Sequence, residues 1–209
     1  MFDLLKTALE QITYPEPPDV YTLGRPLPFF ELFQCRIPEE PGVGAFTLNH
    51  DTRTLHAYAL FRDSDIFSAT TGDNQHSWEL GDTFELFFRL PNHSDYYEIH
   101  STPNNHRLQL HFDDCRTRQE KPLETHFCDL KTSVYNVVDS QNHLWYSQIL
   151  IPLDALETDQ LDGMAFALQR FNRSRQTPGK YEVSSSRKYP ETHTGHTPFA
   201  WHVISHANL

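Results

Sequence analysis

TFELFFRL, residues 83–90, is the stretch of sequence that decides the fold. Its aromatic residues and its β-branched threonine are typical of a β-strand, and successive side chains of a strand point to opposite faces of the sheet. Phe84, Leu86 and Phe88 therefore share one face, and Glu85 lies on the other. We expect the three apolar residues to face the core. Glu85 is then expected on the outer face, where its carboxylate can accept hydrogen bonds from hydroxyl groups.

Similar short segments recur on both sides of this strand. Residues 45–49 and 55–61 flank a polar turn at residues 50–53, as in a β-hairpin with a four-residue connection. Further strands are expected at residues 96–101, 107–112, 132–138, 144–151, 165–171 and 201–204. So many short strands, with no alternation of strand and helix, predict an all-β fold: an antiparallel, jelly-roll-like β-sandwich.

The chain begins with one amphipathic helix. Apolar residues recur at helical spacing between residues 3 and 12, and the proline-rich segment at residues 15–18 ends the helix. We therefore divide the chain into a helix and proline-rich lead-in over residues 1–20 and a single β-sandwich domain over residues 21–209. A chain of 209 residues can fold as one such sandwich.

The composition narrows the class of ligand. The formal net charge of −11 is unfavourable for nucleic acid or anionic lipid, because binding to phosphates depends on clustered Lys and Arg. No apolar run is long enough to insert into a membrane. Cys35, Cys115 and Cys128 are too far apart for a disulfide framework or a thiolate zinc site. The first residues lack the basic and apolar regions of a secretory signal, so the sequence as it stands predicts a cytoplasmic location.

No arrangement of residues indicates catalysis. Asp82 and Glu85 come nearest to the paired carboxylates of a glycosidase, but residues three apart on a strand project to opposite faces and cannot flank one bond. The sequence also has no G-x-S-x-G, P-loop or H-E-x-x-H motif. We expect a binding protein and not an enzyme.

The chain has 13 histidines, which raise the alternative of a metal site. His193 and His196 could chelate a divalent ion from a loop, and imidazole suits zinc, copper or nickel. His100, His106 and His111 form a second group in a predicted hairpin. Histidines spread over the turns of a His-rich chain are usually exposed and hold no metal, and that is the expectation here.

Several segments, in their order along the chain, resemble the family 9 carbohydrate-binding modules and their DOMON-like relatives. They are residues 55–65, 78–88, 96–99, 145–156 and 163–170. The most specific part is Trp78 followed by Gly81, Asp82 and Glu85 at the head of an aromatic strand.

The resemblance implies a β-sandwich whose shallow aromatic slot holds a terminal sugar between two tryptophans. Trp78 matches the first tryptophan, Glu85 matches a carboxylate that binds hydroxyls, and Arg107 lies near the position of a sugar-binding arginine. His193 stands where the second tryptophan is expected, so this chain departs from the family there. Some members carry structural calcium, which is therefore an expected cofactor, although its ligands cannot be matched in this sequence.

The sequence therefore predicts a non-catalytic module that binds a carbohydrate at Trp78, Glu85, Arg107 and His193. Two alternatives stay open. Some DOMON-like relatives bind haem through an axial Met and His, and Met164 is the only internal methionine here, so a haem- or metal-binding protein is the first alternative. The second is an interaction or structural sandwich that has lost sugar binding and has a protein partner.

Overall fold

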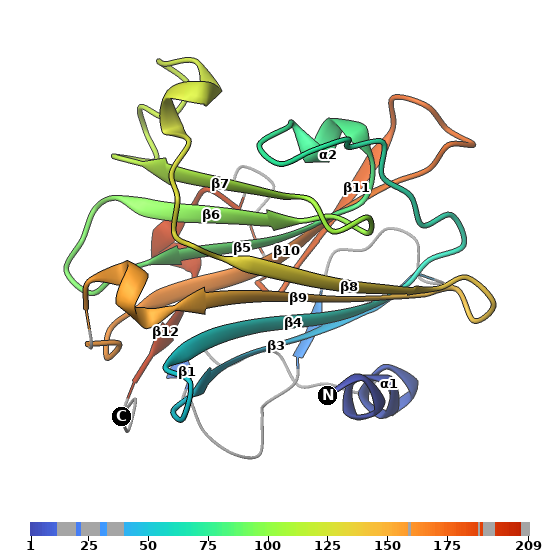
Figure 1. The fold of residues 1–209 in the computed structure, drawn as a ribbon, viewed down its shortest axis with the longest axis horizontal. Coiled ribbons are helices and arrows are strands. Elements are labelled where there is room, and N and C mark those ends of the chain that lie inside the picture. Colours follow the sequence, from blue (N-terminus) through green and yellow to red (C-terminus); the bar gives the residue numbers. More distant parts are fainter. Residues whose placement is uncertain are drawn as a thin grey trace.

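Two β-sheets packed face to face form the body of the molecule in the computed structural model (Figure 1). The structure describes residues 1–11, 20–21, 30–32, 40–158, 160–187, 189 and 195–205. Within them the predicted all-β sandwich with a short N-terminal helix is confirmed. The helical elements are α1 (Phe2–Gln11), α2 (Ser77–Leu80) and the 3-10 helices η1 (Leu123–His126), η2 (Leu153–Leu156) and η3 (Pro198–Ala200).

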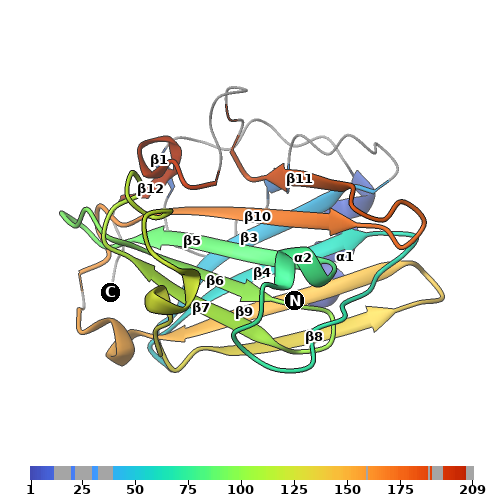
Figure 2. The same cartoon turned by 90° about the horizontal axis from the view of Figure 1, so that it is seen from above.

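The larger sheet has seven strands. Its main path runs β1-β12-β10-β5-β6-β7, and β11 also pairs with β10. The strands are β1 (Val20–Tyr21), β12 (His202–Ile204), β10 (Ala165–Arg173), β11 (Tyr181–Ser185), β5 (Thr83–Arg89), β6 (Tyr96–Ser101) and β7 (Arg107–Phe112). Figure 2 shows β10, β5, β6 and β7 side by side, and β11 and β12 pair with opposite ends of β10.

The smaller sheet has five strands in the order β2-β3-β4-β9-β8. They are β2 (Phe30–Leu32), β3 (Gly42–Asn49), β4 (Thr54–Arg62), β9 (Leu144–Pro152) and β8 (Ser133–Asp139). The predicted hairpin is confirmed: β3 and β4 pair antiparallel across residues 50–53, and Arg53 in that turn has a positive φ of 50°. Neither β2 nor β11 was expected from the sequence.

The main core lies between the two sheets. Phe84, Leu86 and Phe88 are fully buried in it, together with Phe46 and Trp145 from the smaller sheet. The predicted inward face of residues 83–90 is therefore confirmed. Because side chains alternate along β5, this places Glu85 on the outer face of the larger sheet.

Helix α1 covers the outer face of the smaller sheet (Figure 1). Leu5 and Leu9 are buried against Val43, Leu60 and neighbouring residues of β3, β4 and β9. None of the described helices is long and apolar enough to cross a membrane.

Irregular segments cover the outer face of the larger sheet. Phe87 and Tyr96 lie on this face, and Trp201, from the segment after η3, packs on both rings. This part of the outer face therefore forms a second apolar cluster that is shielded from solvent.

A buried ion cluster joins the two sheets at one end. Arg170 of β10 donates a hydrogen bond to Asp63, which follows β4, and its Nη2 lies 4.0 Å from Asp82 Oδ1 at the start of β5. The guanidinium also lies 4.8 Å from the ring centre of Phe61. All three charged side chains are about 1% exposed or less, so they interact out of contact with water.

Candidate functional site

The site begins at Trp78 in the one-turn helix α2, at the end of the larger sheet. Its indole is partly buried and stacks on the His76 ring, with the ring centres 4.9 Å apart and the planes 12° apart. The edge of His100 meets the indole at 5.5 Å. Arg173 of β10 donates a hydrogen bond to the Trp78 carbonyl oxygen and so ties the helix to the sheet.

Gly81 and Asp82 explain the Gly-Asp part of the motif that follows Trp78. Gly81 has a φ of +151° and bridges to Ser68, and a Cβ there would lie 2.5 Å from the Phe67 carbonyl oxygen. The Asp82 carboxylate accepts the backbone N–H groups of Phe67 and Arg173. The pair therefore sets where β5 begins, and with it the position of Glu85 relative to Trp78.

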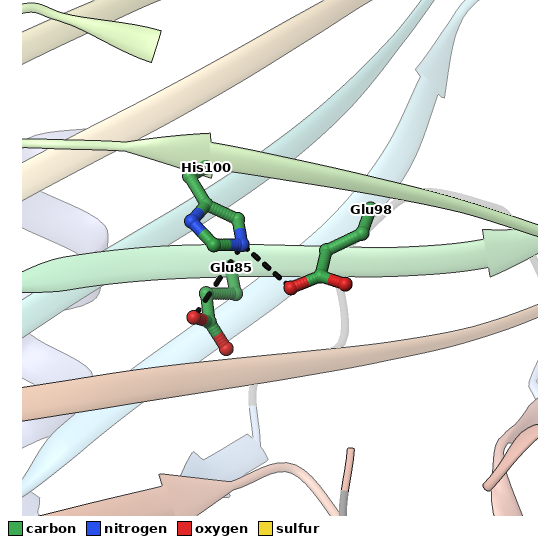
Figure 3. A group of neighbouring side chains, drawn as sticks. All are labelled: Glu85, Glu98 and His100. Atoms are coloured by element: carbon green, nitrogen blue, oxygen red, sulfur yellow. Dashed lines mark hydrogen bonds and ion pairs between the residues drawn. The ribbon is translucent and has the colours of Figure 1, made fainter. Parts of the chain in front are cut away.

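A row of polar side chains crosses the outer face of the larger sheet. The strand register places Gln169 of β10 beside Glu85 of β5, and Glu85 beside His100 of β6. Gln169 Nε2 donates to Glu85 Oε2 at 2.6 Å, and His100 Nε2 lies 3.5 Å from Glu85 Oε1. His100 Nε2 is also 2.6 Å from Oε1 of Glu98, the next outward-facing residue of β6 (Figure 3).

Burial sets the protonation of this cluster. It raises the pKa of Glu85 to about 8, although His100 acts in the opposite direction. For Glu98, burial is outweighed by the charge of His196 and by the hydrogen bond and charge of His100, which leave its pKa below the usual value. Of these two histidines, His100 has the more secure effect on the pKa of Glu98. Burial lowers the pKa of His196 and so favours its uncharged form. For His100, burial is outweighed by Glu85 and Glu98, which raise its pKa.

Residues 195–201, called the Gly195 segment below, pack against the cluster: Gly195 lies against Gln169, and His196 lies 3.6 Å from Glu98. A Cβ on Gly195 would lie 2.7 Å from Gln169 Oε1 and 2.9 Å from the Phe87 ring, so only glycine fits this close to the sheet. Trp201 Nε1 holds the segment by donating to the Gly195 carbonyl at 2.9 Å. His196 Nδ1 lies 2.8 Å from the Tyr96 hydroxyl.

The structure brings together two of the predicted site residues. Trp78 and Glu85 both contact His100. The expectation that the Glu85 carboxylate reaches the surface is wrong, since this residue is 1% exposed beneath the Gly195 segment. Arg107 pairs with Ser101 and not with His100, so it lies on the other face of the sheet, where it binds Asp73. His193 lies outside the described residues.

Sequence reasoning missed Glu98 and Gln169 and misjudged His100. It treated the hairpin histidines as exposed, whereas His100 is fully buried. Alternation alone places Glu98 and His100 on the face of Tyr96. What the sequence did not reveal is that a segment almost a hundred residues away covers that face.

The sequence raised two cofactors, calcium and haem, and the described residues bear on each. Calcium takes six to eight oxygen ligands, whereas the group of His, Asp and Glu side chains that converges within the described residues contains a histidine: Glu85, Glu98 and His100. Structural calcium therefore stays a prediction. Met164, on which the haem alternative depends, is fully buried in the core between the sheets, so ligation by its sulfur requires the core to open.

No protein-family model and no curated protein matches this sequence significantly. The fold, however, matches solved structures. A candidate carbohydrate-binding protein from Bacteroides uniformis aligns with a TM-score of 0.63 and 14% identity over 86% of each chain. A family 9 carbohydrate-binding module from Caldicellulosiruptor kristjanssonii, solved with cellotriose, aligns with a TM-score of 0.62 and 12% identity over 89% of this chain and 91% of that one. A family 9 module from the same organism, solved with glucose, aligns with a TM-score of 0.61 and 11% identity over 89% of this chain and 93% of that one. The chain therefore has the β-sandwich fold of the family 9 carbohydrate-binding modules.

Proposed function

We propose that this chain is a non-catalytic carbohydrate-binding domain whose sugar stacks on Trp78. The shared fold supports this class of function, because two of the similar structures hold glucose or cellotriose. Sugar sites in proteins use an aromatic face for the apolar C–H groups of the ring and a few fixed polar groups for its hydroxyls. Trp78 is an aromatic residue that lies beside polar groups here, His100 and Ser77.

The observation that carries the proposal is the stacked pair of His76 and Trp78. A flat ring already lies parallel to the indole at 4.9 Å, so this face accepts a ring. The His76 side chain is 41% exposed and can turn away into solvent. A pyranose ring that replaces it would stack on the same face of Trp78.

Glu85 has an indirect part in this proposal. Its carboxylate lies beneath the Gly195 segment and reaches Trp78 only through His100. We therefore expect Glu85→Gln to change sugar affinity much less than loss of the indole. A large effect of Glu85→Gln would instead mean that the Gly195 segment moves aside and that the carboxylate binds hydroxyls directly.

Glu85 and Glu98 invite comparison with a glycosidase pair. One has a raised pKa and the other a lowered pKa, as for an acid and a nucleophile. A working pair must leave the scissile bond between the two carboxyl groups. Here the His100 ring contacts both carboxylates and fills that space. We therefore expect no hydrolysis of chromogenic glycosides.

The test is a glycan array followed by calorimetric titration of the sugars that bind. Trp78→Ala should weaken binding by about 30-fold or more, equivalent to about 2 kcal/mol, because aromatic anchors carry a large share of binding energy. Tyr135→Ala is the control, since this tyrosine is a surface aromatic residue, 55% exposed, that lies on the other sheet.

Three other outcomes would contradict the proposal. If Trp78→Ala leaves sugar affinity intact but costs about 3 to 5 kcal/mol of folding free energy, the indole is only a core lid. If Tyr181→Ala abolishes binding and Trp78→Ala does not, the sugar occupies the polar hollow of about 630 Å³ beside Tyr181. A folded protein that binds no glycan on the array would favour a sandwich that has lost sugar binding.

A further inference from the structure

We propose that Glu85, Glu98 and His100 form a binding site for one first-row divalent transition-metal ion, with Zn²⁺ as the best fit. The inference does not rest on sugar binding. It rests on the geometry of the three donors, on the residues that hold them, and on one buried oxygen without a partner.

The donors converge from two neighbouring strands (Figure 3). One ligand atom from each of the three side chains lies within 4.8 Å of the others. Zinc binds nitrogen and oxygen at about 2.0 to 2.2 Å, which puts two ligands of one ion roughly 3.5 Å apart. His100 Nε2 and Glu85 Oε1 are 3.5 Å apart. His100 Nε2 and Glu98 Oε1 are closer, at 2.6 Å, because a proton joins them; an ion in the place of that proton needs only a small rotation of Glu98.

In His100 and Glu85, the side-chain atom that would not bind the ion already makes a hydrogen bond. His100 Nδ1 lies 2.7 Å from the hydroxyl of the buried Ser77, which turns Nε2 toward the two carboxylates. Gln169 donates to Glu85 Oε2 and leaves Oε1 facing His100. Metal-binding histidines and carboxylates in proteins are oriented by such outer hydrogen bonds, and loss of one typically lowers affinity by 10- to 100-fold.

Glu98 Oε2 supplies an independent observation. Glu98 is 4% exposed, and this oxygen has no hydrogen-bond partner. His196 Nδ1 lies 3.6 Å from it, beyond hydrogen-bond distance. A buried carboxylate oxygen without a partner is costly. A metal ion bound by both oxygens of Glu98 would remove that cost.

The donor set also selects the ion. Two carboxylates neutralise one divalent cation, which a buried site requires. One imidazole with two carboxylates suits zinc, and also manganese or iron, whereas calcium and magnesium favour oxygen ligands. The absence of cysteine from the group makes a thiolate-type site impossible.

The experiment is calorimetric titration of the full chain, freed of metal with a chelator, with Zn²⁺ and in parallel with Mn²⁺ and Ca²⁺. We expect one equivalent of Zn²⁺ to bind, and Ca²⁺ to bind at least 100-fold more weakly. Glu98→Gln and His100→Gln should each weaken Zn²⁺ binding by 10-fold or more. The controls Glu79→Gln and His93→Ala replace exposed residues of the same types and should leave Zn²⁺ affinity unchanged.

Three further measurements keep the proposal falsifiable. Circular dichroism checks that each variant is folded, and Ser77→Ala, which keeps all three ligands, should still weaken binding by about 10-fold. Because the site is buried, the titration is repeated on protein refolded from urea with Zn²⁺ present. No binding in either format, or binding that Glu98→Gln and His100→Gln leave unchanged, would overturn the site. All of these titrations run without sugar, and the sugar titrations run in chelator, so failure of one proposal leaves the other standing.

Discussion

Gly81 shows how a single residue positions the site. Its φ of +151° is a conformation that other residues rarely adopt, and its missing Cβ lets the chain pass directly against Phe67 and Ser68. We expect Gly81→Ala to lower the free energy of unfolding by more than about 2 kcal/mol, because the new methyl group meets rigid backbone. Urea denaturation measures the change.

Gly72 provides the matched control for this prediction. A Cβ there meets nothing within 4 Å, and its backbone conformation needs no glycine. Gly72→Ala should change stability by no more than about 0.5 kcal/mol. If the two variants were equally stable, Gly81 would not fix the start of β5.

For single residues, the sequence predicted which face of the sheet a side chain lies on better than it predicted how exposed that side chain is. Strand alternation correctly separated Phe84 from Glu85. It also placed Asp82 and Glu85 apart, and the structure has Asp82 beside Arg170 and Glu85 beside His100. It failed for the exposure of Glu85, because exposure depends on which distant segment covers a face, and no local pattern contains that information.

Helix α1 is the element whose contribution is simplest to isolate. Leu5 is fully buried against the smaller sheet, whereas Leu4, its neighbour in sequence, is 57% exposed. Leu5→Ala should therefore cost about 2 to 5 kcal/mol of folding free energy, as truncation of a buried leucine does. Leu4→Ala should cost less than about 0.5 kcal/mol. Equal costs in thermal or chemical denaturation would show that α1 does not stabilise the sandwich.

The elements found from sequence are those with strong local signals. β6 and β7 were predicted with the bounds that the structure gives, because alternation and the turn between them agree. β11 was missed although Tyr181, Glu182 and Val183 alternate between apolar and polar residues, because the alternating run is short. It is a strand because it pairs with the end of β10, which is a tertiary effect.

For the molecule as a whole, the Asp63–Arg170–Asp82 cluster links the sheets and makes stability depend on pH. Burial raises the pKa of Asp82 from 3.8 to about 7, with Arg170 acting against it and Asp63 with it. Between about pH 4 and pH 7, Asp82 holds a proton in the folded state that it has released in the unfolded chain. The contribution of Asp82 to stability therefore falls as pH rises from about 4 to 7 and is level above.

Arg170→Met tests this linkage. Without the guanidinium, two buried carboxylates lose their cation, and we expect a loss on the order of 3 to 5 kcal/mol at neutral pH. The loss should be larger at pH 8.5 than at pH 5.5, because protonation relieves the buried charges at the lower pH. Lys121→Met, which breaks the exposed pair with Asp113, is the control and should cost less than about 1 kcal/mol. Urea denaturation at both pH values measures the difference, and an equal loss at the two would contradict the assignment.

The pairing of β1 with β12 has a consequence for biosynthesis. Val20 lies beside Val203 in parallel register, so one edge of the larger sheet cannot form until residue 203 has been translated. Gly195, which lies against Gln169 and Phe87 on the outer face of the sheet, belongs to the same later part of the chain. During translation the outer face of β5 and β6 therefore stays open to water after its strands have been made. A small ion present in the cell at that moment can reach Glu85 and His100 directly, whereas one added to the folded protein must wait for the Gly195 segment to open.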